Sequence, residues 1–175
     1  MDLYLTVIEL IDTRSFTSMW FWIVLAVFWS TISHFVMGVP FDLVQRAQRL
    51  GGQTLEDVAT LARINATRLL YISGAAGLFL TGGAACFLTM LALLGFLYGI
   101  EFCQALFLLA LPFTVVGFIS QRTARRIIGG ESEGERLVRR LKRHRLTVQM
   151  VGVLSIFITA FWGIFHAMSV TVLGG

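Results

Sequence analysis

Charged residues are scarce in this chain and unevenly placed. They make up 14% of the 175 residues, against 57% apolar residues, whereas a soluble domain carries about 25% charged residues. Four stretches contain none at all: 19–39, 69–100, 102–120 and 146–175. Because about 20 mostly apolar residues cross a hydrocarbon core of about 30 Å, these stretches predict a small polytopic membrane protein without a separate soluble domain.

Cysteine is scarce as well. Cys86 and Cys103 both lie in apolar stretches, and neither has another cysteine or a histidine nearby at ligand spacing. Two thiols cannot fill the ligand set of an iron–sulfur cluster or a structural zinc site. We therefore expect no metal site and two cysteines that serve as small buried apolar residues.

The N-terminus lacks the positive region that opens a signal peptide. Asp2, Glu9 and Asp12 outnumber Arg14 there. The apolar residues of segment 1–18 recur loosely at helical spacing, which is typical of a helix lying along a membrane surface. We expect the apolar stretch that follows to be retained as a span.

These patterns predict an all-α fold, a bundle of four transmembrane helices in a single membrane domain over residues 1–175. The expected spans are 19–39, 69–98, 102–120 and 146–169. The stretch 69–100 would extend about 48 Å as one helix, so the second span is expected to tilt or to protrude. We expect a tight turn at Tyr98–Glu101, because Glu101 would be costly inside the membrane.

The loop expected at 41–68 contains signals for two helices. Residues 41–50 suit a short helix closed by Gly51 and Gly52. Thr54 followed by Asp57 resembles a capping box, which would start a helix that leads directly into the second span.

The loop expected at 121–145 is interrupted by Gly129 and Gly130. Ser132 with Glu135 is a second capping-box match. A helix that starts there would carry its apolar residues on one side and continue into the fourth span. The apolar residues of that side are Leu137, Val138 and Leu141.

Basic residues set the expected orientation. Of the 14 Lys and Arg residues, nine fall in 121–145 and four in 41–68, while one precedes the first span. The positive-inside rule places both basic loops in the cytoplasm. The N-terminus and the C-terminus are then both outside.

His34 and His166 are the histidines inside expected spans, where paired histidines can ligate haem. His34 falls near the cytoplasmic end of the first span, whereas His166 lies about 20 residues, or ~30 Å, along the outward fourth span. The two therefore cannot share one iron in this topology. Either one remains a candidate as a lone axial ligand to haem or chlorophyll, or as an interfacial histidine bonded to backbone or water.

The sequence has no residue pattern typical of catalysis or of ion-coupled transport. The expected spans contain no Asp, Glu, Lys or Arg, although ion-coupled carriers usually place such residues there. No G-x-S-x-G, H-E-x-x-H or glycine-rich phosphate motif occurs. We expect no enzyme, and a small transporter is kept as an alternative.

Small residues recur at helical spacing in two spans. In lipid, close packing of such residues drives helix association, either within the chain or with a partner helix. The helix-packing residues expected are Ser73, Gly77, Thr81 and Ala85 in the second span, and Ala160, Gly163 and Ala167 in the fourth.

The basic cluster and the aromatic residues suggest surface contacts. Each basic residue near an anionic leaflet contributes about 1 kcal/mol of attraction, so anionic lipids are expected as partners and nucleic acid is not. The chain has 15 Phe, 4 Trp and 3 Tyr, which on outward faces would contact lipid, a carotenoid, (bacterio)chlorophyll or another subunit. The headgroup-binding residues expected are Arg136, Arg139, Arg140, Lys142, Arg143 and Arg145.

Several stretches resemble a family of integral membrane proteins from alphaproteobacteria of the Rhodobacter–Roseobacter group, often labelled as a component of the Suf iron–sulfur assembly complex. The similarity covers most of the chain and implies a bacterial inner membrane, where the large assemblies of that group include photosynthetic cores and respiratory complexes. The stretches are I-D-T-R-S-F at 11–16, W-S-T at 29–31 through G-V-P at 38–40, R-I-N at 63–65 on to Tyr71, Q-A-L-F-L-L-A-L-P at 104–112 and R-T-A-R-R at 122–126.

The sequence thus favours a non-catalytic accessory subunit of a larger energy-transducing membrane complex, either a photosynthetic reaction centre–light-harvesting core or a respiratory complex. No cofactor is required for that role. The alternatives are a redox subunit that binds haem or pigment through one histidine, and a small transporter or lipid-binding membrane protein.

Overall fold

The computed structural model describes residues 19–130 and 133–173, and almost all of them are helical. The all-α expectation is confirmed, with one minimal hairpin added. The elements are α2 (Met19–His34), β1 (Phe35–Val36), β2 (Val39–Pro40), α3 (Phe41–Leu50), α4 (Gly52–Ala92), the π-helix η1 (Leu93–Leu97), α5 (Glu101–Ile128) and α6 (Gly134–Leu173).

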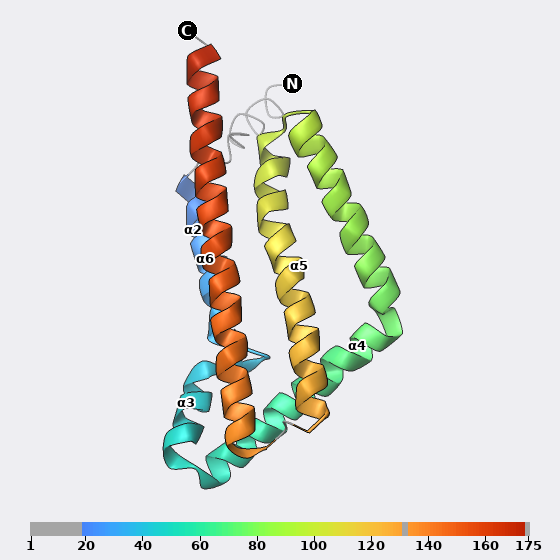
Figure 1. The fold of residues 1–175 in the computed structure, drawn as a ribbon, viewed down its shortest axis with the longest axis vertical. Helices are drawn as coiled ribbons and strands as arrows, with labels where there is room; N and C mark the ends of the chain where they lie inside the picture. The colour runs from blue at the N-terminus through green and yellow to red at the C-terminus, as the bar shows by residue number, and fades with distance from the viewer. Residues whose placement is uncertain (1–18, 131–132, 174–175) are drawn as a thin grey trace, which may run out of the picture.

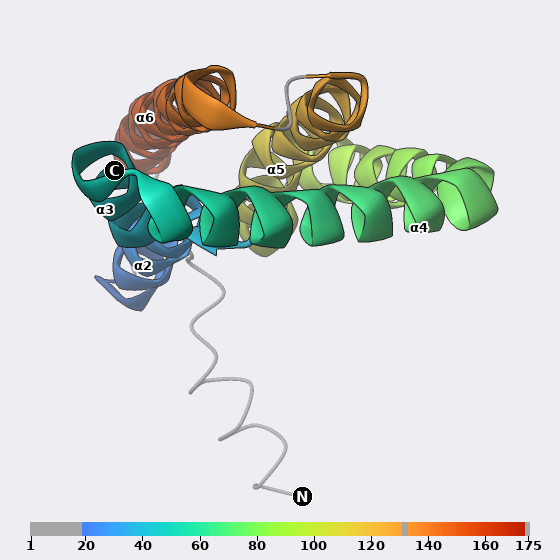
Figure 2. The same ribbon diagram turned by 90° about the horizontal axis from the view of Figure 1, so that it is seen from below.

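The molecule is elongated (Figure 1). α2, α5, α6 and the second part of α4 run along its long axis, while α3 lies at the lower end and the first part of α4 crosses that end obliquely. From below, the first part of α4 passes under α5 (Figure 2). Within the described residues, three helices are long and apolar enough to cross a membrane, over Gly52–Leu97, Glu101–Ile128 and Gly134–His166.

The helix α2 is shorter than the expected first span. It ends at His34, and its 16 residues extend ~24 Å, less than a core of about 30 Å. A hairpin follows in place of the last helical turn, with antiparallel pairing between Phe35 and Pro40. Met37 and Gly38 turn the chain with φ of 55° and 74°, and two consecutive left-handed residues suit the tight turns that match strand twist.

The first expected loop is largely helical, as the sequence indicated. α3 has the expected bounds, and α4 continues from it into the second span without a break. The capping box at Thr54 is wrong, because α4 begins at Gly52 and has Gly51 at its N-cap without a side-chain hydrogen bond. Asp57 instead accepts a hydrogen bond of 3.2 Å from Gln53.

The second expected loop is almost entirely helix. α5 runs past the expected end of its span to Ile128, and α6 begins at Gly134, so a few residues connect the two. Gly129 ends α5 as expected, with its N–H bonded to the Arg125 carbonyl at 2.9 Å. Arginine is a good helix former, which is why this basic stretch extends both helices. The proposed cap at Ser132 and the surface helix at 1–18 lie outside the described residues.

The main hydrophobic core sits at the end that carries the basic residues. It joins the hairpin, α3, the first part of α4, the end of α5 and the start of α6, and a smaller cluster joins α2, α5 and α6. By contrast, the most apolar 18-residue windows of the three long helices are 6%, 22% and 28% buried. The fold is therefore held mainly by this basic end, where water drives apolar burial. Its fully buried members include Val39, Val44, Val58, Ala62, Ile127, Leu137 and Leu141.

Candidate functional site

The small-residue face of α4, formed by Ser73, Gly77, Thr81 and Ala85, makes little contact with the rest of the chain. A Cβ atom added at Gly77 would meet no atom within 4 Å, and the same holds at the other glycines of this part of α4. Thr81 and Ala85 are exposed. The sequence suggested, as its first interpretation, that this face packs within the chain. The described structure does not use the face in this way. The other three glycines are Gly74, Gly82 and Gly83.

The packing seam of α6 lies on a different set of residues from the one expected. A Cβ atom at Gly152 would lie 2.8 Å from the ring of Trp29 on α2. Ser155 is buried and its hydroxyl lies 3.5 Å from the Leu108 carbonyl of α5. Thr159 is 1% exposed. These small side chains let α6 approach α2 and α5 closely.

The expected series on α6 shares one member with this seam. Gly163 is buried, whereas Ala160 is half-buried. The side chain of Ala167 lies outside the described set. The observed seam is displaced around the helix because Trp29 fixes the contact at Gly152.

Gln104 connects three segments at the end opposite the basic core. It is 5% exposed, donates to the Gly95 carbonyl at 2.7 Å, and accepts from the Trp162 indole at 3.0 Å. The π-helix η1 supports this arrangement, because π turns leave carbonyls without their usual i→i−4 partners. Phe96 adds an edge-to-face contact with Trp162, with ring centroids 5.3 Å apart.

The two candidate haem ligands lie far apart. His166 Nε2 is 3.5 Å from Glu101 Oε1, at the start of α5. His34 is exposed at a groove of about 810 Å³ between α2 and α6, where Leu146 also lies. His166 is 20 residues beyond Leu146 on α6, or ~30 Å. The two imidazoles therefore lie at different levels along α6.

The cysteines and the acidic and histidine side chains form no metal centre in the described parts of the chain. Across residues 19–130 and 133–173, no group of three or more His, Cys, Asp or Glu side chains could hold a metal ion. Both cysteines were expected to be buried. Cys86 is exposed on α4, so the prediction is wrong for this residue within the chain, and Cys103 is half-buried. Cys86 lies outside the core because its part of α4 packs against little.

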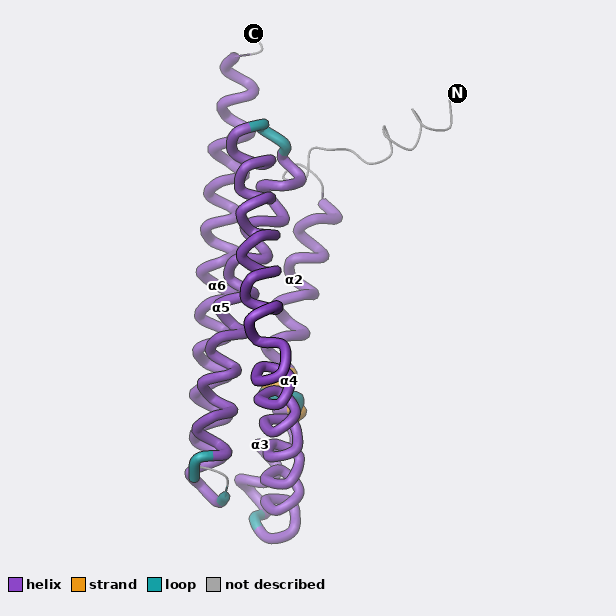
Figure 3. The backbone as a smooth tube through the Cα atoms, turned by 90° about the vertical axis from the view of Figure 1, so that its right-hand side faces the viewer, coloured by secondary structure: helices purple, strands orange, loops and turns teal. Residues whose placement is uncertain are grey.

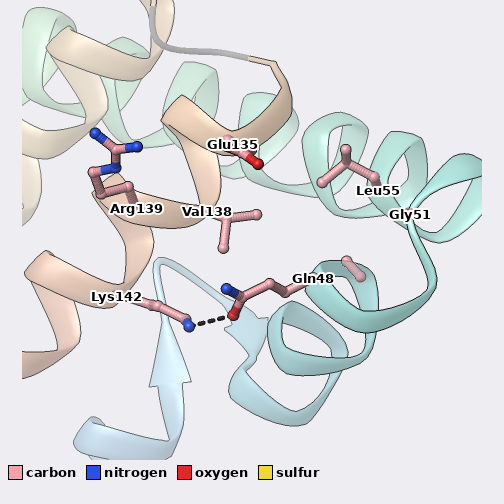
Figure 4. Close-up of a pocket in the computed structure, with 8 residues that line it drawn as sticks. Gln48, Gly51, Leu55, Glu135, Val138, Arg139 and Lys142 are labelled. Atoms are coloured by element: carbon pink, nitrogen blue, oxygen red, sulfur yellow. Dashed lines mark hydrogen bonds between the residues drawn. The ribbon is translucent and has the colours of Figure 1, made fainter.

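The headgroup-binding residues divide into two sets at the basic end. Arg136, Arg139, Arg140 and Arg143 line a hollow of about 210 Å³ on α6. Arg139 also borders a pocket of about 350 Å³ between α3, the start of α4 and α6, where Lys142 donates a hydrogen bond to Gln48 (Figure 4).

Arg145 differs from the other headgroup candidates because it packs on an aromatic ring. Its guanidinium carbon lies 3.7 Å from the centroid of the Phe41 ring. This cation–π contact ties α6 to the start of α3 and holds the basic end together.

His144 is a buried polar residue that sequence reasoning missed. Its Nδ1 lies 3.0 Å from Thr123 Oγ1, and burial lowers its pKa from 6.5 to about 4. It belongs to the charged part of α6, ahead of the charge-free stretch that begins at Leu146. One signal was present: His144 continues the helical spacing of two buried residues, Leu137 and Leu141.

No family, no characterised protein and no solved structure matches this chain in comparisons with known proteins.

Proposed function

We propose that this chain is a non-catalytic accessory subunit that contributes a helix face to a larger membrane complex. The observation that carries the proposal is the second part of α4, whose most apolar window is 6% buried. Four glycines lie there with open space beside them. Glycine in a helix costs roughly 0.5–1 kcal/mol relative to alanine, and no contact in the described chain offsets this cost.

A partner helix would make use of these glycines. In lipid, helices associate through close approach of backbones at small residues rather than through hydrophobic burial. The face from Ser73 to Ala85 offers such an approach. Large exposed side chains flank it, including Leu78 and Leu80, which are 85% and 53% exposed, and these would contact either the partner or lipid.

The proposed topology has four spans with both termini outside. Figure 1 shows that α2 begins and α6 ends toward the same end of the molecule, and the basic core lies at the other end. The positive-inside rule would place the basic end in the cytoplasm. With its short length, α2 would need local thinning of the bilayer or snorkelling of flanking residues to cross it.

The proposed setting is a bacterial inner membrane, and the proposed host is a photosynthetic core or a respiratory complex. Both proposals depend on the resemblance to the alphaproteobacterial family. Exposed aromatic side chains on α4, such as Tyr71, Phe79 and Phe87, would give carotenoid or (bacterio)chlorophyll of such a host a contact surface.

The test is purification of the tagged full chain from native membranes in mild detergent, followed by native gels and mass spectrometry. We expect comigration with a large membrane complex. Gly77→Leu and Ala85→Leu should release the chain from that complex. The matched control is Gly117→Leu, which changes an equally open glycine on α5 and should leave the complex intact. Migration of the wild-type chain alone, without a copurifying protein, contradicts the proposal.

Anionic lipid is proposed as a second partner, because four arginines share one hollow on α6. The same purification tests it by lipid analysis. The triple charge reversal Arg139→Glu, Arg140→Glu and Arg143→Glu should remove copurifying anionic lipid and leave the protein partner bound. Unchanged lipid content would show that these arginines do not bind lipid and only set the orientation of the chain in the membrane.

A further inference from the structure

An open cavity of about 340 Å³ lies where α2, the hairpin, α4, α5 and α6 come together. In Figure 3 the hairpin strands are seen behind α4, above the level of α3. The lining combines apolar side chains with three polar ones, and it includes no charged residue among those the structure describes. The lining residues are Ile32, Phe35, Met37, Gly38, Asn65, Leu69, Val116, Ser120, His144 and Val148.

The hydrogen bonds around His144 fix its tautomer. The Thr123 hydroxyl donates to the Ile119 carbonyl at 2.9 Å, so its single hydrogen is already used. Thr123 Oγ1 must therefore accept from the His144 ring, with Nδ1 carrying the proton. The other ring nitrogen, Nε2, then holds a lone pair that can accept a hydrogen bond.

The polar groups of the cavity have no partners within the described chain. No hydrogen bond joins His144 Nε2, the Asn65 amide or the Ser120 hydroxyl to another described residue. None of these atoms is fully enclosed either. Ligand sites combine apolar walls with a few placed polar groups, and this cavity has that composition.

The cavity lies at the boundary between charge-free and basic sequence. Ser120 ends one charge-free stretch, Asn65 precedes another by four residues, and His144 precedes a third by two. A ligand here would have its polar part at the level of the lipid headgroups and its apolar part along the helices. That position suits an amphiphile that enters from the membrane.

We propose that this cavity binds the head of an uncharged, hydroxyl-bearing amphiphile, whose hydroxyl donates to His144 Nε2. Asn65 and Ser120 would bond its remaining polar groups. An anionic head would be desolvated there without a cation among the lining residues, which is unfavourable. Membrane quinols and diacylglycerols share the required chemistry. The proposal does not depend on the accessory-subunit function.

The test uses the purified full chain in nanodiscs of phosphatidylcholine, titrated with three probes. The probes are a short-chain benzoquinol under reducing conditions, a short-chain diacylglycerol and, as the charged control, a short-chain phosphatidic acid. Histidine labelled with ¹⁵N reports hydrogen bonding at each ring by NMR. We expect saturable one-to-one binding of an uncharged probe, with a shift at His144 Nε2 and none at the exposed His34.

Variants locate the binding. His144→Phe and Ser120→Leu fill the cavity and should weaken binding at least tenfold, whereas His34→Phe should leave it unchanged. Which uncharged probe binds more tightly identifies the source of the hydroxyl. Absence of saturable binding for both uncharged probes, or tighter binding of phosphatidic acid, overturns the proposal. If His144→Phe fails to fold, the ¹⁵N shift of His144 in the wild type and the affinity of Ser120→Leu for the probes still test the proposal.

Discussion

At the scale of single residues, Gln104 shows how a polar side chain is used where water is scarce. Its amide both donates and accepts, so one residue of α5 satisfies a carbonyl of η1 and an indole of α6. An apolar residue at this position would leave both groups unpaired. Buried groups without partners are costly.

Gln104→Leu should lower the free energy of unfolding by about 2 kcal/mol, since unpaired buried groups cost roughly 1–3 kcal/mol. Thermal unfolding in detergent measures this. The control is Gln149→Leu on α6, because Gln149 is half-buried and makes no hydrogen bond within the described chain. Equal stability of the two variants would show that the Gln104 bridge contributes nothing.

His144 predicts a specific pH dependence of stability. Burial lowers its pKa from 6.5 to about 4, so between these values the unfolded chain takes up a proton that the folded chain refuses. Stability is therefore lost as pH falls from about 6.5 toward 4. The loss is about 3 kcal/mol, because one pKa unit corresponds to about 1.4 kcal/mol.

The comparison that isolates this effect is wild type against His144→Gln, unfolded at a series of pH values. The stability advantage of the wild type over the variant should shrink by about 3 kcal/mol between pH 7 and pH 4. The exposed His34 is common to both proteins and cancels. A constant difference across that range would show that His144 titrates normally in the folded chain.

At the scale of elements, α4 joins two different kinds of helix. Its first part is amphipathic and contributes Val58, Ala62 and Ala66 to the main core. Its second part carries the small-residue face and leans back toward α5, which it reaches at the top (Figure 1). Both parts are helical, but three of the four buried residues of α4 lie in the first part, and the fourth, Leu91, lies next to η1.

Replacing Gly95 of η1 or Gly83 of α4 with alanine should change the stability of the fold in opposite directions. A Cβ at Gly95 of η1 would lie 2.9 Å from the Gln104 backbone nitrogen, so Gly95→Ala should cost about 1–3 kcal/mol, as overpacking does. At Gly83 a Cβ meets nothing within 4 Å, so Gly83→Ala should raise stability by about 0.5–1 kcal/mol. Chemical unfolding of the isolated chain measures both, and a loss of stability at Gly83 would reveal an internal contact.

At the scale of the whole molecule, the proposed orientation can be tested directly. After both native cysteines are replaced by serine, single cysteines at Met19, Gly99 and Gly130 report sidedness with a membrane-impermeant maleimide. Met19 and Gly99 should label from outside intact cells. Gly130 should label after the membrane is opened, because the basic end is expected in the cytoplasm.

The Met19 position also decides the number of spans. Labelling of Met19 from outside means that α2 crosses the membrane despite its 16 residues. Labelling after permeabilisation alone means that α2 stays on the cytoplasmic side and that the chain has three spans, which would contradict the proposed four.

The sequence by itself determined the elements whose signals are local. Charge-free runs predicted the helices, and Gly51 and Gly129 marked helix ends where the structure has them. The expected turn before Glu101 is also present, because a carboxylate and a glycine at φ of 71° at Gly99 favour a break there. These features depend on backbone preference and on the cost of charge in lipid.

The tertiary structure alone decided which of these helices touch. The bridge at Gln104, the burial of His144 and the empty face beside Gly77 all depend on residues far away in the chain. A single sequence gives the periodicity of a helix but not the neighbour on each side of it. Small residues permit contact with any close helix, and in lipid no hydrophobic drive selects among them, so only the three-dimensional arrangement shows which faces remain open.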